Sequence, residues 1–300
     1  MATTICIEIE DAVATVWLNG AQQRNALSQA TWEAIPLAIA EAQATPGCRV
    51  IVLRGSGGNF GAGADIKEFG AVFADQAATL DYFERMETAM RSIEAAVRPT
   101  IAVIEGLCYG ASVALALACD IRLAASSSSF AITPARLGII YPYGDVARVV
   151  TAIGERRAKT MMYSGRAISA ATALDYGMVD DLLDGEFEAG VSAFVDAVAS
   201  SSPWTIATTR QAIADVRRAA LPEEAGYPHK MAEAVTGPDF AEGMRAFSER
   251  RSPSFPNLDV SADNPVHREE TFSSLKEDHG CADHNVDGAP FISGGMQGDT

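Results

Sequence analysis

Hydrophobic and polar residues alternate over the first part of the chain. The runs ICIEIED and AVATVWL, residues 5–18, have the period of two that is typical of half-buried strands. Their short separation predicts an antiparallel pair. From residue 28 to 43 the apolar spacing becomes that of a helix, and Ser28 is placed to cap its N-terminus.

Continuous apolar runs predict three buried strands, within residues 48–55, 99–106 and 120–126. A glycine-rich turn follows each of the first two strands, and a helix follows each turn, the first of them over residues 74–96. This recurring order predicts an α/β architecture whose site is formed by the loops after the strands.

The second half of the chain has mostly helical periodicity. The segments with this pattern are residues 154–165, 169–177, 187–200, 203–220 and 238–251. After Arg251 the sequence becomes rich in Pro, Gly, Ser and Asp and loses its periodic apolar positions. We therefore expect roughly the last 45 residues to form a mobile tail.

The composition is that of an ordinary globular protein. The 300 residues are 48% hydrophobic and 21% charged, which suits one large domain with a sizeable core. The longest apolar runs are shorter than the roughly 20 residues that a membrane helix requires, so no membrane span is expected. The N-terminus has no basic start followed by an apolar block, and we expect a cytoplasmic protein.

Charge, cysteine and histidine content exclude several function classes. A formal net charge of -16 argues against nucleic-acid binding, although a few local cations still suffice to hold one phosphorylated small molecule. Five scattered cysteines favour reduced thiols. All four histidines lie in the last quarter of the chain, which disfavours a histidine-activated nucleophile in the main domain. The tail group fits no closed zinc site, so no metal is expected; its members are His279, Cys281, Asp283 and His284.

The turn NFGAGADIKEF, residues 59–69, is the first candidate site. Its small residues let the backbone approach a ligand and leave N–H groups free to donate. It is neither a Gly-Lys-Ser/Thr phosphate loop nor a dinucleotide-binding fingerprint. The second turn, in GLCYGASVALALACDI at residues 106–121, leads into a helix whose positive dipole end lies near Gly110. Both turns thus offer backbone donors.

Four motifs together resemble the crotonase superfamily, which comprises enoyl-CoA hydratases and isomerases. They are RNALS at 24–28, the turn at 59–69, YGASVALALACDIRLAA at 109–125 and ALDYGMVDDLL at 173–183. They are spread in the family's order over residues 5–255. The resemblance implies an α/β fold that is a spiral of ββα turns with a C-terminal helical trimerisation region.

The resemblance also implies a domain organisation and a ligand. Residues 1–190 correspond to the spiral core, 191–255 to a helical region for oligomerisation and CoA contact, and 256–300 to a flexible tail. The implied assembly is a homotrimer or a dimer of trimers. The implied ligand is an acyl-CoA thioester, with no cofactor other than the CoA of the substrate.

The site residues that the resemblance implies begin with two backbone donors. The N–H groups of Ala62 and Ala111 correspond to the oxyanion hole that binds the thioester carbonyl and stabilises an enolate. The family usually has Gly where this chain has Ala111, and Ala also supplies the N–H. The expected substrate contacts are Arg24, Ala26, Ala64, Asp65, Ile66, Lys67, Gly110, Pro134 and Tyr143, together with Phe247 and Arg250 of a neighbouring subunit.

The proton-transfer residues of the family are missing from their usual positions. Ala114 and Pro134 stand where family hydratases carry two glutamates, and neither residue exchanges a proton. The local substitutes are the side chains of GIIYPYGDVARV, namely Tyr141, Tyr143 and Asp145. Asp145 fits equally well as the N-cap of the next helix, and the tyrosines as walls of the acyl pocket. Glu68 and Glu105 flank the two turns and are further candidate acids.

Two function hypotheses follow from these residues. In the first, the protein is an acyl-CoA enzyme of the hydratase/isomerase type that stabilises a thioester enolate, with hydration, isomerisation, hydrolysis and C–C cleavage left open. In the second, it binds CoA thioesters as a catalytically poor scaffold. Turnover of acyl-CoAs separates the two.

Overall fold

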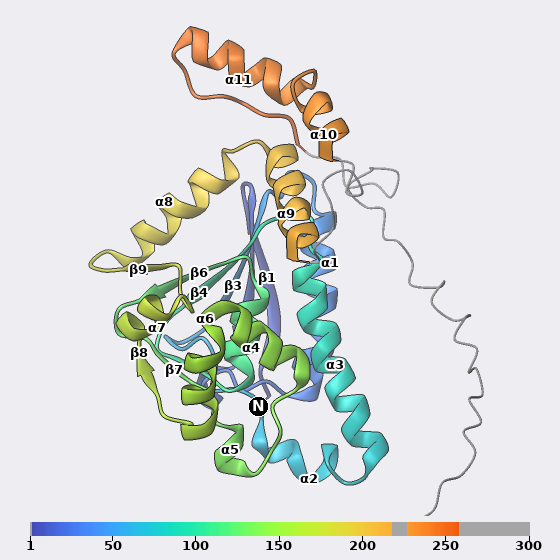
Figure 1. The fold of residues 1–300 in the computed structure, drawn as a ribbon, viewed down its shortest axis with the longest axis vertical. Coiled ribbons are helices and arrows are strands. Elements are labelled where there is room, and N and C mark those ends of the chain that lie inside the picture. The colour runs from blue at the N-terminus through green and yellow to red at the C-terminus, as the bar shows by residue number, and fades with distance from the viewer. Residues whose placement is uncertain (1, 218–226, 258–300) are drawn as a thin grey trace, which may run out of the picture. The chain divides into compact units, whose positions relative to one another are not determined.

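The computed structural model describes residues 2–217 and 227–257. Its main sheet has six strands in the order β1-β2-β3-β4-β6-β9 (Figure 1). β1 (Thr4–Glu10) and β2 (Val13–Asn19) are antiparallel, as the alternation predicted. The remaining neighbours run parallel; they are β3 (Val50–Gly55), β4 (Thr100–Ile104), β6 (Ile121–Ala125) and β9 (Asp181–Leu183). A second sheet has the order β5-β7-β8, formed by β5 (Leu107–Tyr109), β7 (Ser129–Ala131) and β8 (Ile168–Ser169).

Helices connect the strands and follow the sheet. They are α1 (Gln29–Ala44), α2 (Phe69–Val72), α3 (Gln76–Glu94), α4 (Ala111–Ala118), α5 (Pro134–Leu137), α6 (Tyr143–Ser164), α7 (Ala170–Tyr176), α8 (Phe187–Ala199), α9 (Pro203–Arg217), α10 (Tyr227–Ala234) and α11 (Pro238–Glu249). Two short 3-10 turns lie at Ala21–Gln23 and Ile66–Glu68. Ser28 caps α1 as predicted, because its hydroxyl accepts the Thr31 N–H and the Thr31 side chain accepts the Ser28 N–H.

The buried strands have apolar side chains on both faces, which explains their continuous hydrophobic runs. In β3, Ile51 and Leu53 belong to a large core shared with α1, α3 and α4. Val50 and Val52 belong to a second core, against Val191 and neighbouring residues of α8. Helices therefore pack on both faces of the sheet, and this holds β3 and β4 in place as supports for the turns that follow them.

The structure differs from the predicted elements in a few places. The helix predicted at 154–165 is only the second part of α6, which bends at Gly154, where φ is +76°. The short strands β5, β7, β8 and β9 and the helix α10 were not predicted, because segments of two to eight residues carry little periodic signal. Residues 258–300 of the predicted tail lie outside the described residues.

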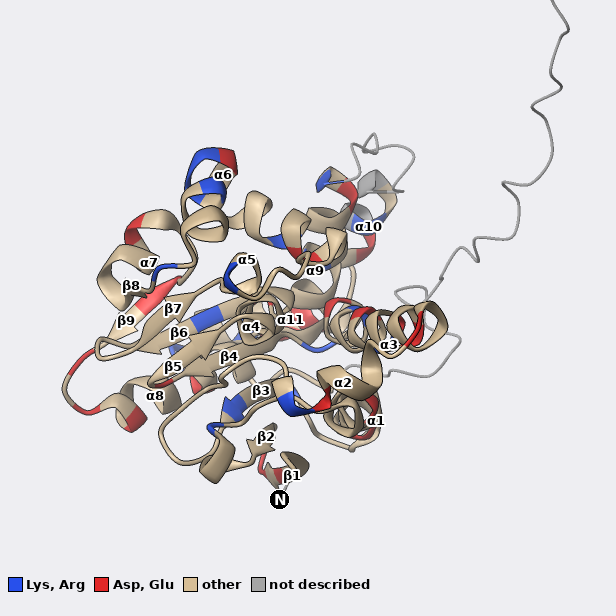
Figure 2. Cartoon of the chain, turned by 90° about the horizontal axis from the view of Figure 1, so that it is seen from below, with Lys and Arg blue, Asp and Glu red and all other residues tan. Residues whose placement is uncertain are grey.

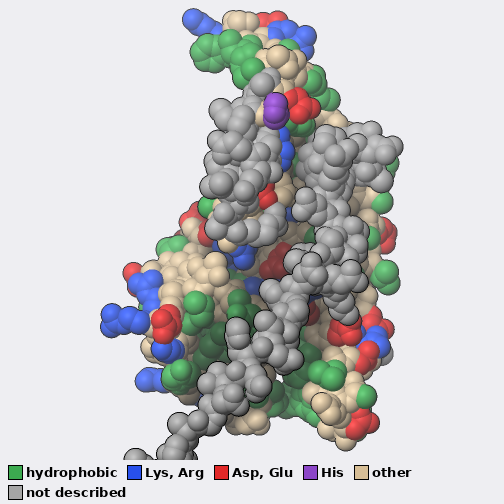
Figure 3. All heavy atoms as spheres, turned by 45° about the vertical axis from the view of Figure 1, so that its right-hand side comes forward, with side chains coloured by type: hydrophobic (Ala, Val, Ile, Leu, Met, Phe, Trp, Pro, Cys, Tyr) green, Lys and Arg blue, Asp and Glu red, His purple; other side chains and the backbone are tan. Residues whose placement is uncertain are grey.

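Acidic residues are spread over many elements of the chain (Figure 2). In the ranges 2–217 and 227–257, no helix is both long and apolar enough to span a bilayer. Figure 3 shows hydrophobic side chains gathered near the bottom of the molecule in that view. Figure 1 places α2 and α5 at the same end of the molecule. The pocket described below opens among residues of these two helices.

Candidate active site

The two predicted turns meet. The turn after β3 runs beside β5, since Tyr109 N–H donates to the Gly61 carbonyl at 2.9 Å. Gly63 has a φ of +96°, and a Cβ there would lie 2.9 Å from the Tyr109 carbonyl oxygen and 3.4 Å from the Ala111 nitrogen. Only glycine therefore allows this turn to pack against the start of α4.

Hydrogen bonding in the first turn identifies which backbone N–H is available to a ligand. Ala62 N–H, the predicted donor, already donates to the Arg24 carbonyl at 2.9 Å. The N–H groups of its neighbours are also satisfied: Gly61 donates to Leu107 O, Gly63 to Ser112 Oγ and Asp65 to Leu27 O. Among the residues that the structure describes, Ala64 N–H has no acceptor, and Ala64 lines the pocket. This turn therefore offers Ala64 N–H in place of Ala62 N–H.

The second turn offers the N–H of Ala111. Ala111 is the first residue of α4, so its N–H has no partner within the helix, and no other acceptor is found in the described part of the chain. Gly110 precedes it as the N-cap with a φ of +52°. Ala111 also lines the pocket, at the end of α4 where the helix dipole favours negative charge.

The pocket beside these donors is apolar. Its lining contains no Asp, Glu, His, Lys or Arg side chain; it is formed by Ala62, Gly63, Ala64, Ile66, Phe69, Phe73, Tyr82, Phe83, Met86, Gly110, Ala111, Thr133, Pro134, Leu137, Ile139, Ile140, Tyr141 and Pro142. Four of these residues form an aromatic cluster. The centroid of the Phe73 ring lies 4.9–5.9 Å from the ring centroids of Phe69, Tyr82 and Phe83. Such walls suit a hydrophobic acyl group.

Tyr141 lies in the pocket wall with its hydroxyl committed to the protein. The hydroxyl donates to the Gly110 carbonyl at 3.0 Å. Burial raises the pKa of Tyr141 well above its usual value, and nearby Asp145 raises it further. The phenol therefore stays protonated at neutral pH and is not a ready base. Tyr143, by contrast, is 89% exposed and does not line the pocket.

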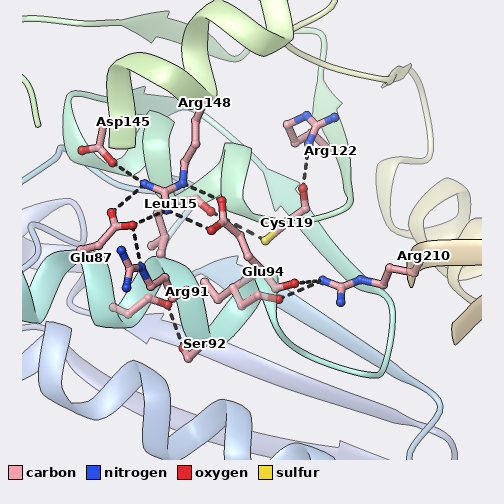
Figure 4. A network of polar contacts seen from close by, with 12 residues as sticks. Glu87, Arg91, Ser92, Glu94, Leu115, Cys119, Arg122, Asp145, Arg148 and Arg210 are labelled. Atoms are coloured by element: carbon pink, nitrogen blue, oxygen red, sulfur yellow. Dashed lines mark hydrogen bonds and ion pairs between the residues drawn. The ribbon is translucent and has the colours of Figure 1, made fainter. Parts of the chain in front are cut away.

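Asp145 is neither the cap of α6 nor part of the pocket wall. Pro142 occupies the N-cap position, and Asp145 lies within the first turn of the helix, 2% exposed. Its Oδ1 accepts from Arg148 at 3.0 Å, while its buried Oδ2 has no hydrogen-bond partner among the described residues. Figure 4 shows Arg148 also bound to Glu87 and Glu94 of α3. The expected N-cap is thus wrong, and the carboxylate joins a buried ionic cluster instead.

Burial raises the pKa of Asp145 from 3.8 to about 7, in spite of the opposing effect of Arg148. Folding therefore favours the protonated carboxyl, and the stability that it contributes is lost as the pH rises through about 7. We expect the free energy of unfolding of Asp145→Asn, relative to wild type, to increase by about 3 kcal/mol between pH 5 and pH 8. Glu87 and Glu94 are present in both proteins, so their contributions to the free energy of unfolding largely cancel in the difference between the two.

Urea unfolding of both proteins at the two pH values measures this difference. Asp175→Asn is the matched control, since it makes the same substitution in an ion pair with Arg157 at the surface, where the Asp175 side chain is 74% exposed and the pair contributes little to stability. Parallel pH profiles for wild type and Asp145→Asn would contradict the assignment.

The two remaining candidate acids have structural partners. Glu68 accepts the backbone N–H of Gln29, at the start of α1, at 2.7 Å. Glu105 pairs with Arg54 at 2.6 Å. Neither lines the pocket. Within the described residues, no acid or base identified in the sequence reaches the pocket wall apart from Tyr141.

The predicted substrate contacts divide into two sets. Ala64, Ile66, Gly110 and Pro134 line the pocket. The others lie outside its lining. Arg24 and Lys67 are exposed, and Ala26 is half-buried. Asp65 caps the 3-10 turn by accepting the Lys67 N–H, Phe247 lies on α11, and Arg250 is the C-cap of that helix. No group of three or more potential metal ligands occurs in the described residues.

Asn25 is a supporting residue whose role the sequence did not reveal. It is fully buried in the RNALS motif, has a φ of +55°, and accepts the Gly20 N–H at 2.9 Å. Its amide donates to the carbonyls of Ser56 and Asn59 at 2.9 and 2.6 Å. The side chain thus fixes the turn after β3 to the turn after β2. The motif marked the position, but only the structure shows which backbone groups it joins.

Comparison with known proteins decides the family. The family model described as enoyl-CoA hydratase/isomerase matches residues 8–257. The chain belongs to the enoyl-CoA hydratase/isomerase family. Among this family's members, a Mycobacterium bovis protein described as a "probable enoyl-CoA hydratase" is 33% identical over 260 residues, which cover 84% of this chain and 97% of the relative. A Bacillus subtilis protein with the same description is 31% identical over 257 residues, 84% of this chain and 98% of the relative.

Solved structures of the family share the fold. An enoyl-CoA hydratase/carnitine racemase from Magnetospirillum magneticum superposes with a TM-score of 0.81 at 30% identity, over 84% of this chain and 95% of that chain. The mixed α/β crotonase fold that the motifs implied is therefore confirmed.

Proposed function

We propose that this member of the enoyl-CoA hydratase/isomerase family processes an acyl-CoA thioester and stabilises its enolate through the N–H groups of Ala64 and Ala111. The observation that carries the proposal is that these two backbone donors lack acceptors in the described residues and line one apolar pocket. A thioester carbonyl oxygen between them gains negative charge as the enolate forms. Donors fixed in advance in a site shielded from water stabilise that charge most effectively.

The absence of an ionisable carboxylate from the described pocket wall bears on which reaction follows. Hydration and double-bond migration move a proton at the α-carbon and need an acid or base within reach. C–C cleavage of a 3-oxoacyl thioester has the same need, because water must add to the 3-carbonyl before the bond breaks. The acyl fragment then leaves as a carboxylic acid, the bonding electron pair becomes the thioester enolate, and the enolate takes up a proton at the α-carbon. All of these reactions pass through an enolate that the two donors would stabilise, so C–C cleavage stays open beside hydratase or isomerase activity.

The experiment incubates the purified protein with crotonyl-CoA and with longer, branched, aromatic and 3-oxoacyl thioesters, following absorbance and product mass. Turnover of any member supports an enzyme, and the product identifies hydration, migration, hydrolysis or cleavage. Binding without turnover across the panel favours a CoA-thioester scaffold. No binding at all contradicts the proposed function.

The apolar wall predicts selectivity for the acyl group. A substrate with a distal carboxylate would bury that charge among the aromatic side chains with no charged partner in the described lining. We expect kcat/KM for 2-hexenoyl-CoA to exceed that for glutaconyl-CoA by at least about a hundredfold. Competition between the two thioesters in one reaction measures the ratio directly. Equal values would show that the acyl group lies outside this pocket.

Assembly as a homotrimer or a dimer of trimers and a cytoplasmic location remain part of the proposal. Three apolar residues of α11 support an interface, since Phe240, Met244 and Phe247 recur at helical spacing and are 48%, 54% and 82% exposed. In the assembly, Phe247 and Arg250 would contact the CoA of a neighbouring subunit. Sedimentation velocity of the full chain measures the oligomeric state.

A further inference from the structure

The second donor of the proposed oxyanion hole is one end of a peptide group whose other end is held by a side chain. Ala111 N–H and the Gly110 carbonyl belong to the same planar unit. The Gly110 carbonyl accepts from the Tyr141 hydroxyl at 3.0 Å and from Val113 N–H at 3.0 Å. Because N–H and C=O point in opposite directions across a trans peptide, holding the carbonyl also orients the N–H.

The first donor is held in the same way by backbone alone. Ala64 N–H shares its peptide group with the Gly63 carbonyl, which accepts the Leu27 N–H at 2.8 Å. Each proposed donor is therefore fixed through the carbonyl at the far end of its own peptide. The difference is that Tyr141 is a side chain, and a substitution can remove its contribution without altering the backbone.

The Gly110–Ala111 peptide needs such an anchor. Gly110 has φ and ψ of +52° and −124°, a conformation that glycine reaches because it has no Cβ. The same freedom lets the peptide that follows rotate, and rotation would turn Ala111 N–H away from the pocket. A hydrogen bond at the carbonyl opposes that rotation, and it also polarises the peptide so that its N–H becomes a stronger donor.

We propose that Tyr141 is a positioning residue that orients and polarises the Gly110–Ala111 peptide for binding the thioester oxygen. This inference rests on the proposed function. Tyr141 is 8% exposed and lies in the pocket wall, so its hydrogen bond is shielded from water. The Tyr141 hydroxyl thus holds the Gly110 carbonyl, as the Leu27 N–H holds the Gly63 carbonyl.

The test measures the carbonyl stretching frequency of bound hexanoyl-CoA that carries ¹³C at the thioester carbon. Wild type should lower this frequency relative to the free thioester, because the donors polarise the carbonyl. Tyr141→Phe should lower it less, and should reduce kcat about tenfold with KM changed by less than about threefold. Tyr109→Phe is the matched control, since Tyr109 immediately precedes Gly110 but its hydroxyl lies 3.2 Å from that of Ser129.

Each outcome decides between the possibilities. A smaller frequency shift in Tyr141→Phe, with Tyr109→Phe like wild type, supports the positioning role. A full shift in Tyr141→Phe overturns it, whatever happens to kcat, because a proton-donating or purely structural tyrosine would leave the bound carbonyl polarised. No shift in wild type would refute the proposed function itself. Tyr141→Met, which also lacks the hydroxyl, replaces the phenylalanine variant if that variant does not fold.

Discussion

Ala111→Pro is expected to lower kcat by at least about a hundredfold while the protein stays folded. Proline has no N–H, so the variant loses one of the two proposed donors. The first position of a helix tolerates proline, because its N–H has no partner within the helix. This chain already begins α5, α9 and α11 with proline.

Gln76→Pro provides the matched control. Gln76 is the first residue of α3, it is exposed, and the preceding Asp75 is extended, which avoids a clash between its Cβ and the proline ring. Gly110, which precedes Ala111, has no Cβ to clash. Both variants place proline at the same position of a helix, and only one of them removes a pocket donor. Steady-state rates on the best substrate of the panel compare them. Wild-type kcat in Ala111→Pro would show that the Ala111 N–H takes no part.

Gly63→Ala is expected to have a similarly large effect, a loss of at least about a hundredfold in kcat/KM. The added methyl group would lie 2.9 Å from the Tyr109 carbonyl oxygen and 3.4 Å from the Ala111 nitrogen. The turn must then move away from α4, and the two donors separate. A shift of 1 Å in such a geometry is enough to abolish most of the benefit of fixed donors.

Gly47→Ala is the control that separates the displacement of the turn from the strain of a positive φ at alanine. Gly47 has a φ of +84°, close to the +96° of Gly63, but a Cβ there would meet no atom within 4 Å. Both variants should lose stability through the positive φ, and Gly63→Ala should lose more because of its contact with the Tyr109 carbonyl oxygen. Thermal unfolding compares the stabilities of the two variants, and steady-state rates compare their activities. Equal activity losses in the two variants would argue against the close approach of Gly63 to Ala111.

The main elements of the fold are readable in the sequence because each has a strong local signal. The alternation of residues 5–18, the Ser28 cap and the apolar runs of β3 and β4 each specify their own structure. The two sheet faces also follow from those apolar runs, since a strand covered on both sides is hydrophobic throughout. The strands of two or three residues in β5 and β8 depend instead on distant partners.

The sequence predicts where in the chain the candidate site lies, but it does not determine which backbone and side-chain groups line it. The sequence identified both turns and Ala111, but a choice between Ala62 and Ala64 requires knowing that the Arg24 carbonyl accepts the Ala62 N–H. Likewise, Asp145, a predicted substitute for the missing glutamates, pairs with Arg148 and does not line the pocket. Both outcomes depend on contacts between segments far apart in the chain.

The most direct test of the proposed site is a crystal structure of the protein with a saturated acyl-CoA such as hexanoyl-CoA. We expect a thioester oxygen within about 3 Å of the backbone nitrogens of both Ala64 and Ala111, with the acyl chain among the aromatic side chains of α2 and α3. A thioester oxygen bound at the Ala62 nitrogen, or one lying outside this pocket, would contradict it.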